Sequence, residues 1–93
     1  MDMNLQKYLS FVKTVEYGSF TKAAEILNYT QSGVSRMIAD LEREWNITLL
    51  ERSKYGIKPT SDGMKLLPYA QNLCAEFDKL QMQIDEINGL DSG

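Results

Sequence analysis

The side chains best suited to chemistry form one short polar series in the first half of this 93-residue chain. They carry hydroxyl, amide and guanidinium groups at positions that one face of a helix and its edge can present together. Arginine can donate two hydrogen bonds to guanine, glutamine can bond in the same way to adenine, and serine can bond to a base or a phosphate. The series therefore predicts recognition by hydrogen bonding, and it consists of Thr30, Gln31, Ser32, Ser35 and Arg36.

Catalysis has no comparable set of residues in this sequence. The chain has no histidine and one cysteine, Cys74, and its acidic residues lack the spacing of metal ligands. It contains neither a glycine-rich phosphate loop nor a nucleophile motif. The adjacent Asp85 and Glu86 are most simply explained as a solvated helix surface, and Cys74 as a buried, inert thiol. We expect no enzyme activity, no metal and no cofactor.

Two short helices joined by a tight turn would position the polar series. Residues 20–27 have the apolar spacing of a helix, and Asn28 suits the left-handed backbone that ends one. A second helix follows, with Thr30 or Ser32 as its N-cap. Its apolar residues share one stripe that faces the core, so its small polar face is free to enter a groove. The predicted core residues of the pair are Ala24, Leu27, Val34, Ile38, Leu41 and Trp45.

Another helix and a small hairpin complete the predicted domain. Residues 4–16 have the broad apolar face of a helix that covers the core, and Gly18 ends it. Residues 47–51 and 57–59 have strand character on either side of a turn at residues 53–56. Such a hairpin is too short to stand alone, so it must pack against the helices as the wing of a winged helix.

The charges are distributed unevenly along the chain. The net charge is −3, yet residues 76–93 hold one lysine and five acidic residues, so the rest of the chain is close to neutral. Residues 52–65 hold four basic residues against Asp62 alone. Binding to phosphates would therefore depend on this local patch rather than on the overall field. Its candidate phosphate contacts are Arg52, Lys54 and Lys58, although Arg52 could instead pair with Glu51 or a helix carboxylate.

The last predicted helix spans residues 61–88 and would be about 42 Å long, which is more than so small a domain can cover. Its apolar residues alternate by four and three, the pattern of a helix–helix interface. These residues are Leu66, Ala70, Leu73, Phe77, Leu80, Ile84 and Ile87. Antiparallel pairing would bring Lys65 near Asp85 and Glu86 of a second copy, so we expect a homodimer through this helix. Alternatively, the part of this stripe near Leu66 could only cover the core of the small domain.

Several blocks of the sequence, in matching order and spacing, resemble the N-terminal DNA-binding domain of LysR-type transcriptional regulators. The resemblance covers residues 3–88, and the blocks lie at residues 19–25, 31–32, 34–36, 41–42 and 50–52. It implies a mainly α fold, a winged helix-turn-helix with a three-helix core and a short β-hairpin wing, followed by a long dimerising linker helix. It also implies that the second helix of the motif enters the major groove while the wing touches the flanking backbone.

These inferences give one domain organisation. Residues 1–60 form the winged helix-turn-helix domain, residues 61–88 the linker helix and residues 89–93 a frayed tail; the helix-turn-helix lies at about 19–38 and the wing at about 47–59. The sequence has no membrane span and no signal peptide, and its single cysteine suits a reducing cytoplasm. The expected partners are double-stranded DNA and a second copy. We expect a small-molecule effector only if the larger C-terminal domain usual in the resembled family accompanies the chain.

The sequence leaves a second class of function open, a small dimeric protein-interaction adaptor or anti-regulator that does not bind DNA directly. The long last helix and the acidic balance would suit such a protein. Against it, the polar face of residues 34–43 offers a partner protein no aromatic or aliphatic anchor. Salt-dependent retention on heparin or duplex DNA would separate the two classes.

Overall fold

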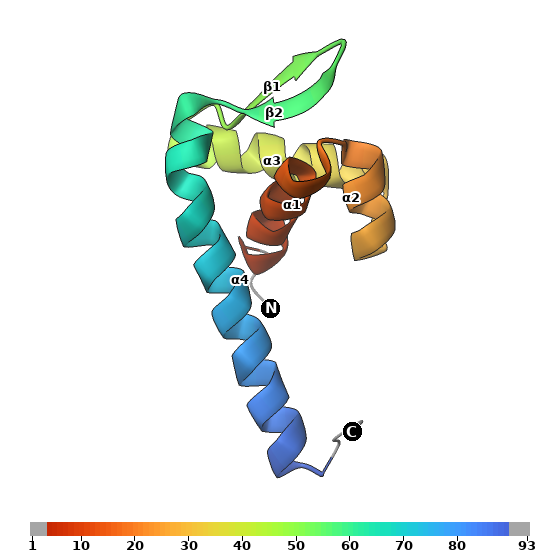
Figure 1. The fold of residues 1–93 in the computed structure, drawn as a ribbon, viewed down its shortest axis with the longest axis vertical. Helices are drawn as coiled ribbons and strands as arrows, with labels where there is room; N and C mark the ends of the chain where they lie inside the picture. Colours follow the sequence, from red (N-terminus) through yellow and green to blue (C-terminus); the bar gives the residue numbers. More distant parts are fainter. Residues whose placement is uncertain (1–3, 90–93) are drawn as a thin grey trace.

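The computed structural model describes residues 4–89, within which four helices surround or extend from one small core and two strands form a hairpin. The hairpin projects from one side of the core and the last helix runs far beyond it (Figure 1). In chain order the elements are α1 (Asn4–Tyr17), α2 (Phe20–Leu27), α3 (Gln31–Trp45), β1 (Leu50–Ser53), β2 (Gly56–Pro59) and α4 (Ser61–Ile87). This arrangement confirms the predicted mainly α, winged helix-turn-helix fold.

Local signals at the helix ends explain where the helices start and stop. Thr30 caps α3 by accepting a hydrogen bond from Gly33 N (3.0 Å), and Ser19 caps α2 in the same way. Asn28 and Asn46 adopt the left-handed conformation, with φ of 60° and 55°, and end α2 and α3. The predicted helix end at Asn28 is therefore confirmed, and of the two predicted N-caps of α3 it is Thr30 that makes the capping hydrogen bond.

The core lies where α1 packs against α2, α3 and the first half of α4. Small residues of α2 are buried there, which lets the helices approach closely. Leu27 and Trp45, which were predicted to be core, are only partly buried because they lie at the last turns of their helices, and Trp45 stacks on Tyr8. The buried core comprises Phe11, Val12, Phe20, Ala23, Ala24, Val34, Ile38, Leu41, Leu49, Leu50 and Ala70.

The hairpin begins later than the sequence predicts. β1 starts at Leu50 rather than at Ile47, and it pairs antiparallel with β2 through a two-residue connection at 54–55. The carboxylate of Glu42 on α3 accepts hydrogen bonds from the backbone amides of Leu49 (2.7 Å) and Leu50 (3.3 Å). Because these bonds tie the preceding stretch to α3, it does not join the strand, and the wing is the shorter hairpin of β1 and β2.

The two halves of α4 have different surroundings. The first half packs against α1, and Ala70 there is only 5% exposed. The core of the domain therefore buries most of this side chain, and its predicted place in a dimer interface stays a prediction. Leu66 packs against the same core, as the alternative of a capping role predicted. The second half extends into solvent (Figure 1) and leaves the other predicted interface residues exposed, namely Leu73, Phe77, Leu80, Ile84 and Ile87.

The end of α4 also follows the sequence signals. The helix ends at Ile87, Asn88 N donates a hydrogen bond to Ile84 O (3.1 Å), and Gly89 adopts a left-handed φ of 69°. The predicted frayed tail begins at this glycine, and its remaining residues, 90–93, lie outside the described residues. None of the helices within residues 4–89 is long and apolar enough to cross a bilayer.

Candidate nucleic-acid interface

The polar series at the start of α3 lies on the surface of the domain. Gln31, Ser32 and Arg36 are exposed, and Ser35 is half-buried at the edge of this face. On the opposite side of α3, three apolar residues are buried and fix the helix against the core: Val34, Ile38 and Leu41. The apolar stripe thus determines which groups α3 presents to solvent, and they are the hydrogen-bonding groups predicted.

Thr30 and Arg36 differ in how many interactions they make within the protein. The hydroxyl of Thr30 accepts the cap hydrogen bond and lies 3.5 Å from Ser32 Oγ, so much of its bonding capacity is used at the helix start. Asp40 lies four residues after Arg36, close enough on a helix to form an ion pair with it, but it pairs with Arg43 instead. Within residues 4–89 the Arg36 guanidinium therefore has no ion pair, and it projects from the exposed face.

Arg52 joins the wing to α3. From β1 its guanidinium donates a hydrogen bond to Ser35 Oγ (3.2 Å) and lies over the ring of Phe20, 4.7 Å from the ring centroid. The sequence predicted a phosphate contact or an ion pair with Glu51, and it did not predict this contact. Phe20, Ser35 and Arg52 are far apart in the chain, so no local spacing signal could have revealed that they meet.

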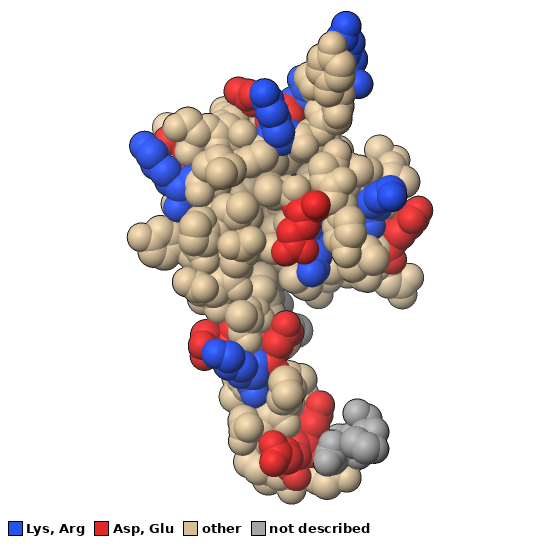
Figure 2. All heavy atoms as spheres, in the orientation of Figure 1, with Lys and Arg blue, Asp and Glu red and all other residues tan. Residues whose placement is uncertain are grey.

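The end of the wing carries exposed basic residues. Lys54 lies at the connection of the hairpin, where its Nζ is 5.2 Å from the centroid of the exposed Tyr55 ring, and Lys58 is exposed on β2. Figure 2 shows basic side chains at the outer end of the hairpin and acidic side chains at the far end of α4. The basic and acidic residues that are separated along the sequence are therefore also separated in space, and the basic residues lie on the wing, next to α3.

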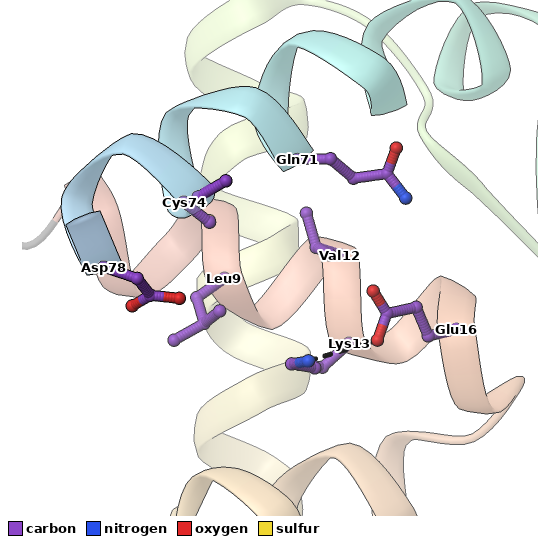
Figure 3. Close-up of a pocket in the computed structure, with 8 residues that line it drawn as sticks. Leu9, Val12, Lys13, Glu16, Gln71, Cys74 and Asp78 are labelled. Carbon is purple, nitrogen blue, oxygen red and sulfur yellow. Dashed lines mark hydrogen bonds and ion pairs between the residues drawn. The ribbon is translucent and has the colours of Figure 1, made fainter. Parts of the chain in front are cut away.

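A groove of about 270 Å³ between α1 and α4 holds polar groups of a different kind (Figure 3). On α1, Lys13 forms an ion pair with Glu16 (3.2 Å), and Cys74 and Asp78 line the groove from α4. Burial raises the pKa of the Cys74 thiol, and the Asp78 carboxylate raises it further, so the thiol stays protonated at neutral pH. In the described part of the chain, no cluster of three or more histidine, cysteine or acidic side chains could hold a metal ion.

Comparison with known sequences assigns the chain to one group of proteins. A family model described as "Bacterial regulatory helix-turn-helix protein, lysR family" matches residues 5–64. The chain is similar to the nitrogen assimilation regulatory protein nac of Klebsiella aerogenes (36% identity over 85 residues) and of Escherichia coli K12 (36% over 91 residues). These matches cover 91% and 98% of this chain but 28% and 30% of the relatives. The chain therefore spans less than a third of their length.

Comparison with solved structures gives the same grouping. The crystal structure of the BenM_DBD/catB site 1 DNA complex matches 100% of this chain and 99% of its own, with 38% identity and a TM-score of 0.82. Full-length BenM, in the R156H mutant, matches 94% of this chain with 38% identity and a TM-score of 0.79, but only 28% of its own chain is covered. The fold described here thus resembles a domain crystallised with DNA and also one portion of a longer protein.

Proposed function

The chain belongs to the LysR family of bacterial regulatory helix-turn-helix proteins, and on that premise we propose that it is the DNA-binding portion of a sequence-specific transcriptional regulator. α3 lies in the major groove and the wing contacts the flanking backbone. The observation that carries this proposal is the exposed polar face of α3, fixed by a buried stripe and flanked by a basic wing. A helix fits the major groove, where each base pair presents a distinct set of donors and acceptors.

Selection of binding sites from random duplexes, at two salt concentrations, tests the proposal. An enriched sequence with salt-dependent affinity is the expected result. The adaptor alternative predicts neither enrichment nor retention on duplex DNA. The comparisons favour DNA binding, because the similar solved structures include DNA-binding domains in complex with DNA.

Within this proposal Arg36 is the principal base-reading residue, with Gln31 and Ser32 beside it. We expect Arg36→Ala to weaken binding to the selected site by about 1–3 kcal/mol and to relax base preference at one position, because a bidentate contact to guanine is lost. Arg43→Ala is the matched control, since Arg43 lies on the same helix but pairs with Asp40. Fluorescence anisotropy with the selected duplex and single-base variants measures both. Equal losses from the two substitutions would contradict the assigned reading face.

Lys54 and Lys58 are proposed to contact phosphates. Each alanine substitution should weaken all duplexes to a similar extent and lower the slope of log K against log salt by about 1, because one fewer counterion is released. Lys79→Ala removes the same charge from the distal half of α4, away from the wing, and should leave the slope unchanged. Titrations across a series of salt concentrations give the slopes. A sequence-selective loss with an unaltered slope would rule out backbone-only contacts.

We further propose that two copies pair through α4. The exposed residues of its distal half form one apolar stripe, which a monomer leaves in water. Antiparallel pairing centred on Phe77 places Ile84 of one copy opposite Ala70 of the other. Ala70 is one of the residues that line an apolar hollow of about 190 Å³; the others are Tyr8, Trp45, Leu66, Tyr69 and Leu73. In this pairing the apolar stripe of one copy would face the apolar hollow of the other.

The charges support the same antiparallel arrangement. It brings Lys65, at the start of α4, near Asp85 and Glu86 at the end of the partner helix, whereas parallel pairing would place acidic groups together. A two-fold axis would then relate two recognition helices, which would read the half-sites of an inverted repeat. Longer relatives contain additional sequence, so we propose a cytoplasmic regulator whose effector, if any, is bound by a further domain.

A further inference from the structure

Two residues that the sequence suggested as separate DNA contacts are joined in the structure. The guanidinium of Arg52 donates a hydrogen bond to Ser35 Oγ (3.2 Å), which links β1 of the wing to the recognition helix α3. The two residues are 17 positions apart in the sequence. The hydrogen bond therefore couples the position of each side chain to the DNA contact that the other can make.

Phe20 holds the guanidinium in place from a third element, α2. The ring of Phe20 is only 8% exposed and belongs to the core, so its position is fixed. Arg52 lies over this ring, 4.7 Å from its centroid, which favours one orientation of the planar guanidinium. A guanidinium has five N–H groups, so the bond to Ser35 leaves others to face a phosphate.

The direction of the hydrogen bond determines what Ser35 can offer to DNA. A serine hydroxyl has one hydrogen to donate and two lone pairs to accept. Because Arg52 occupies a lone pair, the hydrogen of Ser35 must point elsewhere. In a helix it commonly returns to a carbonyl one turn earlier, but within residues 4–89 no such bond from Ser35 is found.

From this geometry we infer that Arg52 is a positioning residue that holds the Ser35 hydroxyl as a hydrogen-bond donor toward an acceptor atom on DNA. Such acceptors are phosphate oxygens and, in the major groove, guanine N7 and O6, adenine N7 and thymine O4. The exocyclic amine of cytosine is a donor, so it cannot receive this hydrogen. The inference rests on the proposed DNA-binding function and specifies the chemistry of one of its contacts.

A double-mutant cycle measured on the selected duplex tests the link. Arg52→Met keeps an apolar stem over Phe20 but removes every N–H donor, and Ser35→Ala removes the acceptor. We expect Ser35→Ala to weaken binding about tenfold and Arg52→Met to weaken it at least as much. The double variant should bind within about twofold of Arg52→Met alone, because Ser35 is no longer positioned once Arg52 is lost. Arg52→Gln provides a second variant, and thermal melting identifies the variants that are folded.

Lys58 supplies the matched control. It is an exposed cation of the same wing, so Lys58→Ala removes one charge as Arg52→Met does. Combined with Ser35→Ala, its effect should multiply within about twofold, as for independent sites. Coupling with Arg52 but not with Lys58 would show that the shared contact, and not the charge of the wing, acts on Ser35.

Single-base variants of the duplex distinguish the two kinds of acceptor. A Ser35→Ala loss confined to one base-pair position, and absent in the Arg52→Met background, identifies a base. An equal loss on every duplex, again coupled to Arg52, identifies a phosphate. Multiplicative losses for Ser35 and Arg52 would overturn the inference. A wild-type protein that bound no duplex would contradict the proposed function itself, so the two failures are distinguishable.

Discussion

Replacing Leu73 and Leu80 together with aspartate is expected to convert the proposed dimer into a monomer and to weaken binding to an inverted-repeat duplex by about a hundredfold or more. The two leucines are 53% and 57% exposed in the isolated chain, so the substitutions leave the core of the domain intact. In a paired α4 each aspartate would lose its hydration against an apolar surface, which strongly disfavours association. The monomer then binds one half-site at a time and loses the gain from simultaneous engagement.

Sedimentation of the wild type and the double variant at micromolar concentration measures the change in assembly. Asn72→Asp combined with Met82→Asp adds the same two charges at exposed positions turned away from the apolar stripe, and this control should remain dimeric. Far-ultraviolet circular dichroism should be similar for all three proteins. A wild type that sediments as a monomer at this concentration would contradict dimerisation through α4.

Gly63→Ala is expected to destabilise the domain by about 3 kcal/mol, although alanine favours helices over glycine by about 1 kcal/mol. A Cβ at this position would lie 2.3 Å from the carbonyl oxygen of Leu49, which is far inside contact distance. That oxygen also accepts a hydrogen bond from Thr60 N (2.9 Å), and the hydroxyl of Thr60 donates to Thr48 O and accepts from Gly63 N. The start of α4 cannot move without breaking these hydrogen bonds to the segment that precedes β1.

Thermal denaturation should show the loss as a fall in Tm of about 12 °C or more for a domain of this size. Ser61→Ala is the control, because Ser61 is exposed in the same helical turn and its change should alter stability by less than about 0.5 kcal/mol. If Gly63→Ala instead melts at the wild-type temperature or above, the Leu49 carbonyl can withdraw, and the glycine is not required for the close approach.

The sequence by itself determined the helices, their ends and the face of α3 that meets solvent. These features rest on neighbours within about one helical turn: Asn28 and Asn46 end helices through their own backbone conformation, and Thr30 caps α3 through an amide three residues away. The apolar stripe is likewise a local period, so it correctly predicted which side of α3 is buried. The matching blocks at separate positions were sufficient to indicate the family, which the comparisons confirm.

The tertiary structure alone decided the features that join distant segments. The carboxylate of Glu42 binds the amides of Leu49 and Leu50, where β1 begins, and the core buries Ala70 on α4. The contact of Arg52 with Ser35 and the approach of Gly63 to the Leu49 carbonyl are of the same kind. Each depends on where folded elements cross, and a linear pattern of residue types does not encode the distance between two atoms on different elements.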